Sequence, residues 1–281
     1  MAGRGQVIRN DMKRASAVWH FGLMAEYWAL FKREAPELPG LLALVARFGQ
    51  PVLDLGCGSG RVLTQLLKHG VDADGVDVSE DMLAHARAAA EQAGYAPSLL
   101  VQTMSDLAPP RRYQTILIVD SFGLGGDRGL DLAILRQCYA ALLPGGALVL
   151  NIGVEYETAA DWGIWTTEGR RHLPQAWPDE AVERVAPNGD LFRLRIRALS
   201  ASPLRQTYAR EMEISKWVDG ALAASESAAL EGNMYLPSEV DLMLRTAEFA
   251  DVEMFDGFSQ TPATDASGQV VIVAQRALPT R

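Results

Sequence analysis

The chain has 281 residues, of which 48% are hydrophobic and 22% are charged. That length predicts one large domain or a domain with an insertion, and the hydrophobic share excludes a disordered chain. The 35 acidic and 26 basic side chains give a formal charge of −9. An acidic balance argues against a nucleic-acid-binding protein, because such proteins need a basic face.

The cysteines and the lengths of the apolar runs exclude further classes of protein. Cys57 and Cys138 make no disulfide framework, and the sequence holds no Cys/His cluster with the spacing of a zinc site. Its first residues lack the apolar stretch of a signal peptide, and no apolar run reaches the ~20 residues of a membrane span. We therefore expect a cytoplasmic protein with no metal site and no membrane partner.

The N-terminal segment, residues 1–40, is predicted to be helical, since Trp19, Phe21, Tyr27 and Trp28 follow one another at helical spacing. One interpretation is a helix that packs its aromatic side chains onto the core. The other is a lid that shields a bound cofactor from water, with Trp19 and Trp28 turned to the substrate. The sequence leaves both interpretations open.

Residues 41–153 alternate strand-like and helix-like runs. Short apolar runs at 51–55 and 75–78 are each followed by a helical pattern, the first ended by Gly70 and the second begun by Ser79 as N-cap. The further elements predicted here are strands at 99–103, 115–119 and 147–152 and a helix at 130–143. Alternating strands and helices predict parallel pairing through right-handed crossovers. We therefore expect the α/β class and a doubly wound, Rossmann-like sheet.

Beyond Gly153 the pattern changes. Residues 192–198 alternate apolar side chains with arginines, a period of two that predicts a half-exposed antiparallel strand, and Asn188-Gly189 and Asp219-Gly220 are hairpin turn signals. Residues 154–235 are therefore predicted to be an antiparallel β cap of three or four strands, inserted after the fifth strand. Residues 236–281 then add a helix, begun by Ser238 as N-cap, and a β-hairpin at 252–258 and 270–274 that completes a seven-stranded core sheet.

The strongest local signal is the glycine cluster that follows the first predicted strand. Gly56, Gly58 and Gly60 let the backbone turn tightly and approach a ligand, as in nucleotide-cofactor loops. The spacing is neither G-x-G-x-x-G nor a P-loop. Asp54, just before the glycines, would repel a pyrophosphate and suits a cation. S-adenosylmethionine, which carries a sulfonium and an ammonium and no phosphate, fits this loop.

A second acid, Asp77, stands at the end of the second predicted strand. A carboxylate in that place can accept hydrogen bonds from both ribose hydroxyls of a nucleoside. The alternative is an ordinary turn or N-cap aspartate. We favour the ribose role, because Asp77 comes together with the glycine loop and the order of strand and helix.

Four motifs in this order resemble those of class I S-adenosylmethionine-dependent methyltransferases of the small-molecule type. They are Asp54-Leu-Gly-Cys-Gly-Ser-Gly60, Gly75-Val-Asp-Val-Ser-Glu-Asp-Met-Leu83, Met104-Ser-Asp-Leu107 and Leu143-Pro-Gly-Gly146. More weakly, Phe21-Gly-Leu-Met-Ala-Glu-Tyr-Trp28 is similar to the aromatic entry helix of such enzymes. Residues 155–235 carry no motif of this family.

The resemblance implies the cofactor S-adenosyl-L-methionine, with S-adenosyl-L-homocysteine as product. It implies that the glycines line the methionine moiety, that Asp54 supports the ammonium and that Asp77 holds the ribose. Cys57 is then a packing residue of the loop, and Thr103 replaces the aspartate with which many relatives hold the adenine amino group. The full set of implied cofactor residues is Tyr27, Asp54, Gly56, Cys57, Gly58, Gly60, Asp77, Val78, Met82, Thr103, Met104, Ser105, Asp120 and Phe122.

The substrate residues and a catalytic base are less constrained. The tryptophans Trp19, Trp28, Trp162 and Trp165 are candidates for the acceptor pocket, because tryptophans in loops cover either a substrate or a subunit partner. The groups that could serve as a base are His20, Asp120, Glu155 and His172. Three arginines, 193, 195 and 197, share one strand face, either a solvated face or dimer edge or an anion site.

The predicted function is in-line transfer of the cofactor's methyl group to a nitrogen or oxygen of a small molecule. The alternative is an enzyme of the same fold that binds the cofactor and catalyses a cyclisation or rearrangement. A nicotinamide oxidoreductase is disfavoured by Asp54 and the missing third glycine. The expected partner is the small-molecule acceptor, and an exposed edge of the inserted strands could pair across a two-fold axis into a homodimer.

Overall fold

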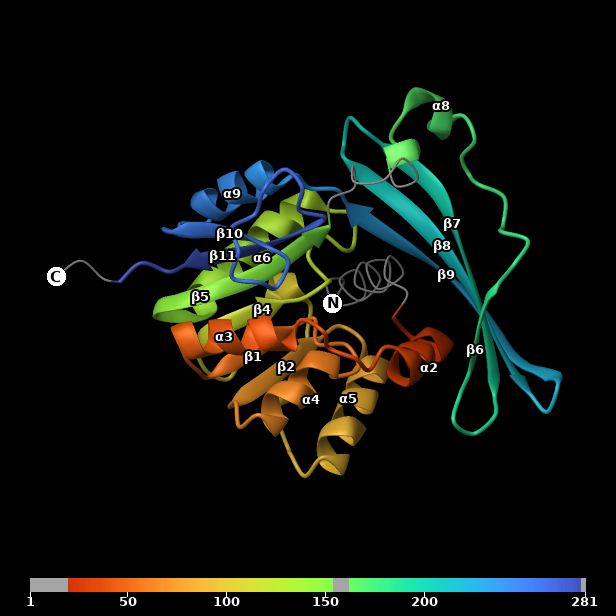
Figure 1. Ribbon diagram of the computed structural model, residues 1–281, viewed down its shortest axis with the longest axis horizontal. Coiled ribbons are helices and arrows are strands. Elements are labelled where there is room, and N and C mark those ends of the chain that lie inside the picture. Colours follow the sequence, from red (N-terminus) through yellow and green to blue (C-terminus); the bar gives the residue numbers. More distant parts are fainter. Residues whose placement is uncertain (1–19, 154–161, 279–281) are drawn as a thin grey trace, which may run out of the picture. The chain divides into compact units, whose positions relative to one another are not determined.

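The computed structural model describes residues 20–153 and 162–278, and the chain divides into two compact units (Figure 1). We call them the core unit and the insertion unit and describe each by itself. Among the described residues, the core unit comprises residues 33–122, 128–153 and 235–278, and the insertion unit comprises residues 20–32, 123–127 and 162–234. The boundaries that the sequence suggested, at residues 40, 153 and 235, stay predictions.

The core unit contains a seven-stranded sheet with the order β10-β11-β5-β4-β1-β2-β3. Neighbouring strands from β3 to β5 are parallel, and β11 runs antiparallel to both β5 and β10. The strands are β1 (Val52–Leu55), β2 (Ala73–Asp77), β3 (Leu99–Val101), β4 (Tyr113–Ile118), β5 (Leu142–Gly153), β10 (Val252–Asp256) and β11 (Gln269–Gln275). The predicted fold class is therefore confirmed.

The strands of this sheet are apolar throughout because both faces are buried. In β4, Ile116 and Ile118 belong to one hydrophobic cluster, whereas Leu117 belongs to the other. The first cluster includes residues of α6 (Arg128–Ala141) and α9 (Pro237–Thr246), and the second includes residues of α3 (Leu38–Phe48), α4 (Arg61–Lys68) and α5 (Glu80–Gln92). Helices on both faces explain why these strands show continuous hydrophobic runs and no alternation.

Of the two helix N-caps predicted at serines, one is confirmed and one is wrong. Ser79 is the N-cap of α5 as predicted, and its hydroxyl accepts a hydrogen bond from the Met82 N–H at 3.1 Å. The prediction that Ser238 caps the last helix is wrong: the N-cap of α9 is Leu236, two residues earlier, and the helix begins at Pro237. Proline suits that first position because its φ is already helical and it has no N–H to leave unpaired. Helix α3 was not predicted at all.

The insertion unit contains a four-stranded antiparallel sheet with the order β6-β7-β8-β9. Its elements are α2 (Gly22–Phe31), α8 (Thr167–Arg170), β6 (Val182–Val185), β7 (Leu191–Ser202), β8 (Thr207–Val218) and β9 (Ala221–Asn233). Both predicted turns join strands here, and Asp219 and Gly220 have the positive φ angles, 50° and 79°, of a tight hairpin turn. Helix α2 packs Leu23, Met24 and Tyr27 against the sheet.

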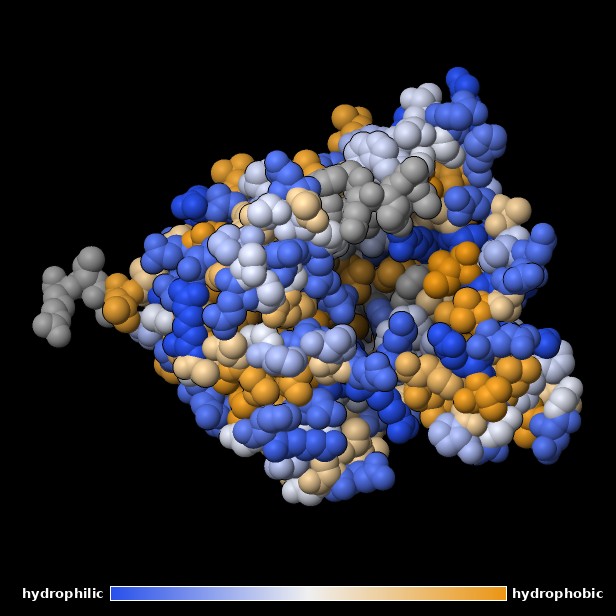
Figure 2. All heavy atoms as spheres, viewed as in Figure 1, coloured by the Kyte–Doolittle hydropathy of each residue, from blue (hydrophilic) through white to orange (hydrophobic). Residues whose placement is uncertain are grey.

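Among residues 20–153 and 162–278, no helix has the length and apolar character needed to cross a bilayer. Hydrophilic residues cover much of the face seen in Figure 2, with small groups of hydrophobic residues between them. Exposed hydrophobic side chains such as Leu204 and Leu242 occur at separate points of the chain. Scattered side chains of this kind are normal on protein surfaces.

Candidate functional site

The glycine cluster forms the loop between β1 and α4. Gly56, Gly58 and Gly60 all have positive φ angles, of 82°, 54° and 80°, which side-chain-bearing residues rarely adopt. A Cβ built on Gly56 would lie 2.5 Å from Ser121 Oγ and 2.6 Å from Met104 Cε, whereas no described atom lies within 4 Å of a Cβ built on Gly58. The loop is therefore packed at its first glycine and leaves open space beside its second.

The close packing at Gly56 gives a stability prediction. Gly56→Ala should lower the free energy of unfolding by about 3 kcal/mol, the sum of positive-φ strain and overpacking against Ser121 and Met104. Gly70→Ala is the matched control, because Gly70 also has a positive φ of 75° but no described atom within 4 Å of its built Cβ. It should cost about 1 kcal/mol, from the φ strain alone. Denaturant unfolding measures both, and equal losses would contradict the packing argument.

Asp54 lies at the end of β1 beneath this loop. It is 2% exposed, and its Oδ2 atom accepts no hydrogen bond from the described residues. Burial raises the pKa of the Asp54 carboxyl to about 7, while the nearby Arg61 acts in the opposite direction. A buried carboxylate oxygen without a donor is costly unless a ligand supplies one. This atom is therefore suited to hold a cationic or N–H-bearing group.

Asp77 closes β2 and holds the loop. Its Oδ2 accepts the Gly58 N–H and its Oδ1 accepts the Ser79 N–H, each at 2.8 Å. Burial raises the pKa of Asp77, and these backbone hydrogen bonds oppose that rise. A carboxylate has about four acceptor positions, so Asp77 can still accept a hydrogen bond from a ligand. Next to it, Val78 is half-buried and Met82 is 1% exposed in the core.

The segment after β3 forms η1 (Met104–Asp106), a short 3-10 helix. The Thr103 hydroxyl accepts the Asp106 N–H at 3.2 Å and donates to Asp106 Oδ2 at 2.9 Å, so it serves as the N-cap of this turn. It also lies 3.2 Å from Ser105 Oγ. Thr103 is thus engaged within its own turn, and the predicted contacts of Thr103, Met104 and Ser105 with adenine stay predictions.

Asp120 follows β4 in a left-handed conformation, with a φ of 55°. Asn151 on β5 holds it in place: Asn151 Nδ2 donates to Asp120 Oδ1 at 2.6 Å, and Asn151 Oδ1 accepts the Asp120 N–H at 2.8 Å. Arg61 makes an ion pair with Asp120 at 3.3 Å and another with Glu37. Asn151 could have been found from the sequence, because it is a polar amide inside the otherwise apolar run 147–152.

These groups all lie at the carboxyl edge of the parallel strands. Asp54 pairs in register with Gly75 on β2 and Leu117 on β4, so the residues that follow β1, β2 and β4 share one edge of the sheet. The Phe122 ring, also beyond β4, lies 5.4 Å from the ring of Tyr235, whose hydroxyl donates to Asp131 at 2.6 Å. Open α/β sheets bind their ligands at this edge.

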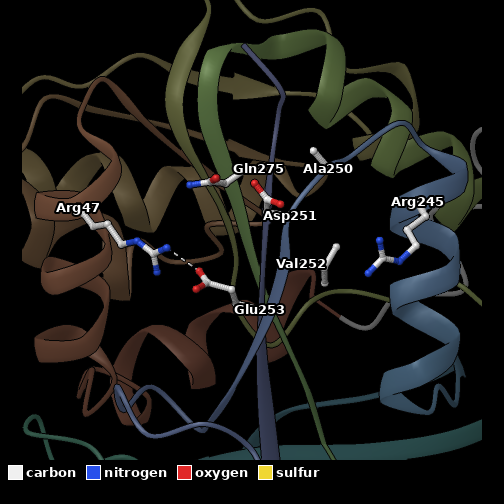
Figure 3. Close-up of a pocket in the computed structure, with 7 residues that line it drawn as sticks. All are labelled: Arg47, Arg245, Ala250, Asp251, Val252, Glu253 and Gln275. Atoms are coloured by element: carbon white, nitrogen blue, oxygen red, sulfur yellow. Dashed lines mark ion pairs between the residues drawn. The ribbon is translucent and has the colours of Figure 1, made fainter.

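A surface pocket of the core unit lies elsewhere. Figure 3 shows its seven lining residues: Arg47, Arg245, Ala250, Asp251, Val252, Glu253 and Gln275. Val252, the first residue of β10, pairs with Ala274, which pairs with Leu148, five residues before the carboxyl end of β5 at Gly153. The pocket therefore lies away from the carboxyl edge of the sheet. Arg47 and Glu253 point toward one another in an ion pair of 2.7 Å. Its charges are thus compensated within the protein, which does not favour a ligand site.

The candidate bases fall in different surroundings. The His20 ring lies edge-on to Trp28 at 5.7 Å, and burial lowers the pKa of His20 to about 4. His172 follows α8, is exposed and contacts Glu168 at 3.2 Å. Glu155 and Trp19 lie outside the described residues. A catalytic role for any of these groups, or for Asp120, stays a prediction.

The aromatic candidates belong to the insertion unit. Tyr27 is 3% exposed and packs against Phe31 and Phe192, with ring centroids 4.9 and 6.2 Å away, and burial raises the pKa of its hydroxyl. Trp28 is half-buried, Trp162 is 42% exposed and Trp165 is 5% exposed. Their predicted contacts with cofactor and substrate stay predictions.

Cys57 of the glycine loop is buried, and burial raises the pKa of its thiol well above the usual value.

Comparison with known proteins adds independent findings. Residues 52–146 match a family model described as a methyltransferase domain. A ubiquinone biosynthesis O-methyltransferase of Vibrio parahaemolyticus is 30% identical over 171 residues, which are 57% of this chain and 72% of the relative. The same-named protein of Bradyrhizobium diazoefficiens is 30% identical over 103 residues, which are 37% of this chain and only 40% of that relative's length.

The fold has a counterpart among solved structures. The crystal structure of an S-adenosylmethionine-dependent methyltransferase from Clostridium acetobutylicum superposes with a TM-score of 0.70, at 14% identity, over 90% of this chain and 97% of that chain. At this identity the likeness concerns the fold alone. The matched domain and the relative covered over most of its length agree with the motifs from Asp54 to Gly146. The chain belongs to the class I S-adenosylmethionine-dependent methyltransferases.

Proposed function

We propose that the protein transfers the methyl group of S-adenosylmethionine to a nitrogen or oxygen atom of a small-molecule acceptor. The observation that carries this proposal is the buried Asp54 oxygen that lacks a hydrogen-bond donor among the described residues. Asp54 leads into the glycine loop, in which no described atom lies within 4 Å of a Cβ built on Gly58. A ligand that brings an ammonium group to this place supplies the missing donor. The residues present therefore fit the cofactor.

The roles of the residues follow from their geometry. In this proposal the glycine loop offers backbone that a ligand can approach closely. The Asp54 carboxylate accepts from the ammonium, and the Asp77 carboxylate accepts from the ribose. When bound, S-adenosylmethionine supplies a methyl group on a positively charged sulfur that is a good leaving group. The protein's task is then to align the acceptor and to exclude water.

A base is needed only for an acceptor that must lose a proton. Asp120 is the candidate base within the core unit, and its carboxylate is oriented by Asn151 and Arg61. Support for a small acceptor comes from the relatives named for the biosynthesis of ubiquinone, itself a small molecule. The formal charge of −9 agrees with a partner other than nucleic acid. A homodimer through the inserted strands remains part of the proposal.

The test is an assay for S-adenosylhomocysteine release with S-adenosylmethionine and a fractionated metabolite pool. We expect release that depends on one fraction and a product of that fraction that is heavier by one methylene group. Consumption of the acceptor without S-adenosylhomocysteine would instead support the cyclisation or rearrangement. Absence of S-adenosylhomocysteine binding by calorimetry would overturn both.

The raised pKa of Asp54 predicts opposite pH dependences of binding and stability. Its folded value of about 7 exceeds the unfolded value of 3.8, so between these pH values the folded protein holds a proton that the unfolded chain has lost. The stability from this group is full below pH ~4 and is lost as the pH rises through ~7. An ammonium-bearing ligand needs the ionised form, so S-adenosylhomocysteine should bind about tenfold tighter at pH 8 than at pH 6.

Calorimetry in buffers of different ionisation enthalpy measures this effect, because binding at pH 6 should release a proton. Asp54→Asn is the matched variant. It cannot ionise, so it should bind the ligand more weakly and with no proton release from this site. Proton release that persists in Asp54→Asn would assign the effect to another group.

A further inference from the structure

The three arginines of β7 each form an ion pair with a glutamate of a neighbouring strand. Arg195 stands directly across from Glu213 and Arg197 across from Glu211, and each of these two pairs forms an ion pair. Arg193 pairs with Glu183 at 2.7 Å. These three arginines are therefore compensated by carboxylates, which favours the solvated face over an anion site for them.

Arg210 on β8 lies on the other face of the sheet and lacks this arrangement. Its neighbours across the strands are Ala198 on β7 and Leu230 on β9, which are 7% and 6% exposed. It forms no ion pair with any carboxylate among residues 20–153 and 162–278, and it is only partly exposed. A guanidinium that is half removed from water on an apolar surface is costly without an anion beside it.

The ring of Tyr208 fixes the surroundings of this guanidinium. The Arg210 Cζ atom lies over the ring, 5.0 Å from its centroid. A Cβ built on Gly232 would lie 2.5 Å from the Tyr208 hydroxyl, so the ring rests directly on the backbone of β9. The guanidinium therefore lies against an aromatic surface, and a guanidinium held in this way can still donate its N–H groups to a carboxylate or phosphate.

A second observation at the same ring points to a ligand. The Trp165 indole lies edge-on to Tyr208, with ring centroids 6.4 Å apart, and Trp165 is 5% exposed. Its buried Nε1–H donates to no acceptor among the described residues. Unsatisfied buried donors are rare and call for an acceptor. The Tyr208 ring thus contacts two groups that lack a partner among the described residues. The Arg210 guanidinium, which has no ion pair, lies over its face, and the Trp165 indole, whose Nε1–H has no acceptor, lies edge-on to it.

We propose that Arg210, with Trp165 as a second donor, binds an oxyanion, the carboxylate or phosphate group of the methyl acceptor. The proposal rests on the proposed function, since it names the chemical class of the substrate: an anionic small molecule. The carboxylate or phosphate provides the counter-charge that Ala198 and Leu230 cannot give to Arg210.

The test uses phenyl phosphate, benzoate and the neutral benzyl alcohol as probes, titrated against the full chain and followed by NMR of the arginine Nε–H groups. We expect the wild type to bind at least one of the two anions tenfold or more tightly than benzyl alcohol. The tighter anion identifies a phosphate or a carboxylate acceptor. Arg210→Gln should remove this preference, Arg195→Gln should keep it, and Trp165→Phe should weaken the preferred anion severalfold.

Equal binding of the three probes by the wild type, or a preserved preference in Arg210→Gln, would overturn the subsite. Unchanged anion binding in Trp165→Phe would overturn the part assigned to Trp165. S-adenosylhomocysteine binding is measured in the same samples and should be equal in wild type and in Arg210→Gln, which also reports that the variant is folded. Loss of that binding in the wild type would overturn the proposed function, whereas its presence without anion preference would overturn this inference alone.

Discussion

Replacing Asp77 by alanine should weaken the binding of S-adenosylhomocysteine about 100-fold or more, since the ribose role proposed for Asp77 involves two charge-assisted hydrogen bonds at ~1.5 kcal/mol each. The same change also releases the Gly58 and Ser79 N–H groups that the carboxylate holds at 2.8 Å, so the glycine loop loses its anchor. Calorimetric titration measures the affinity. Asp77→Asn should also bind weakly, because its amide has one acceptor oxygen where the carboxylate has two.

Glu80→Gln is the control for this experiment. Glu80 is an exposed acid in the first turn of α5, three residues along the chain from Asp77. Its replacement removes the same charge from the same region and should leave the affinity within about twofold, because exposed charges are screened. Unchanged binding in Asp77→Ala would remove Asp77 from the cofactor site.

The second large effect is expected on stability, from a substitution of Asp74 near the start of β2. Asp74 is 6% exposed and accepts hydrogen bonds from the Tyr113 hydroxyl at 2.9 Å, Arg111 Nε at 2.8 Å and the Ser98 N–H at 3.2 Å. Asp74→Ala leaves the hydroxyl of the fully buried Tyr113 without an acceptor. We expect a loss of about 3–5 kcal/mol in unfolding free energy and a fall in Tm on the order of 10 °C.

The matched control is Asp72→Ala. Asp72 binds the same Arg111, through two hydrogen bonds of 2.6 Å, but its side chain is 57% exposed. Ion pairs in water contribute little, so this variant should lose less than about 1 kcal/mol. Thermal unfolding followed by circular dichroism compares the two. A similar fall in Tm for both would show that burial does not govern this cluster.

The fold could be predicted where the signal is local. The apolar run of β1, the glycine loop and the cap at Ser79 each lie within a few residues of the element that they specify, and all were found. Helix α3 was missed because its sequence, LPGLLALVARF, is apolar almost throughout, so that the buried Leu41, Val45 and Phe48 do not stand out from their apolar neighbours. The start of α9 was misplaced because a serine cap and a proline at the first position were both plausible in neighbouring places.

The site was predictable only in part for the same reason. Asp54 and Asp77 stand next to the loop in sequence, whereas Asn151 reaches Asp120 from 31 residues away. Whether Arg210 has an acidic neighbour depends on the register of β7, β8 and β9. This register places Ala198 and Leu230 across from Arg210, whereas Glu213 and Glu211 are across from Arg195 and Arg197. A shift of one residue would exchange the two faces, and the sequence pattern does not specify register to that accuracy.

The pairing of β5 with β11 has a consequence for folding. Gly153 pairs with Gln269, which is 269 − 153 = 116 positions later in the chain. Contacts of such long separation form slowly, because a long loop must close first. During synthesis, the outer edge of β5 therefore stays unpaired until the last strands emerge, and an unpaired apolar edge is a template for aggregation. Loss of the final twenty or so residues would expose the middle of the sheet, so truncated chains should precipitate and not persist as partly active enzyme.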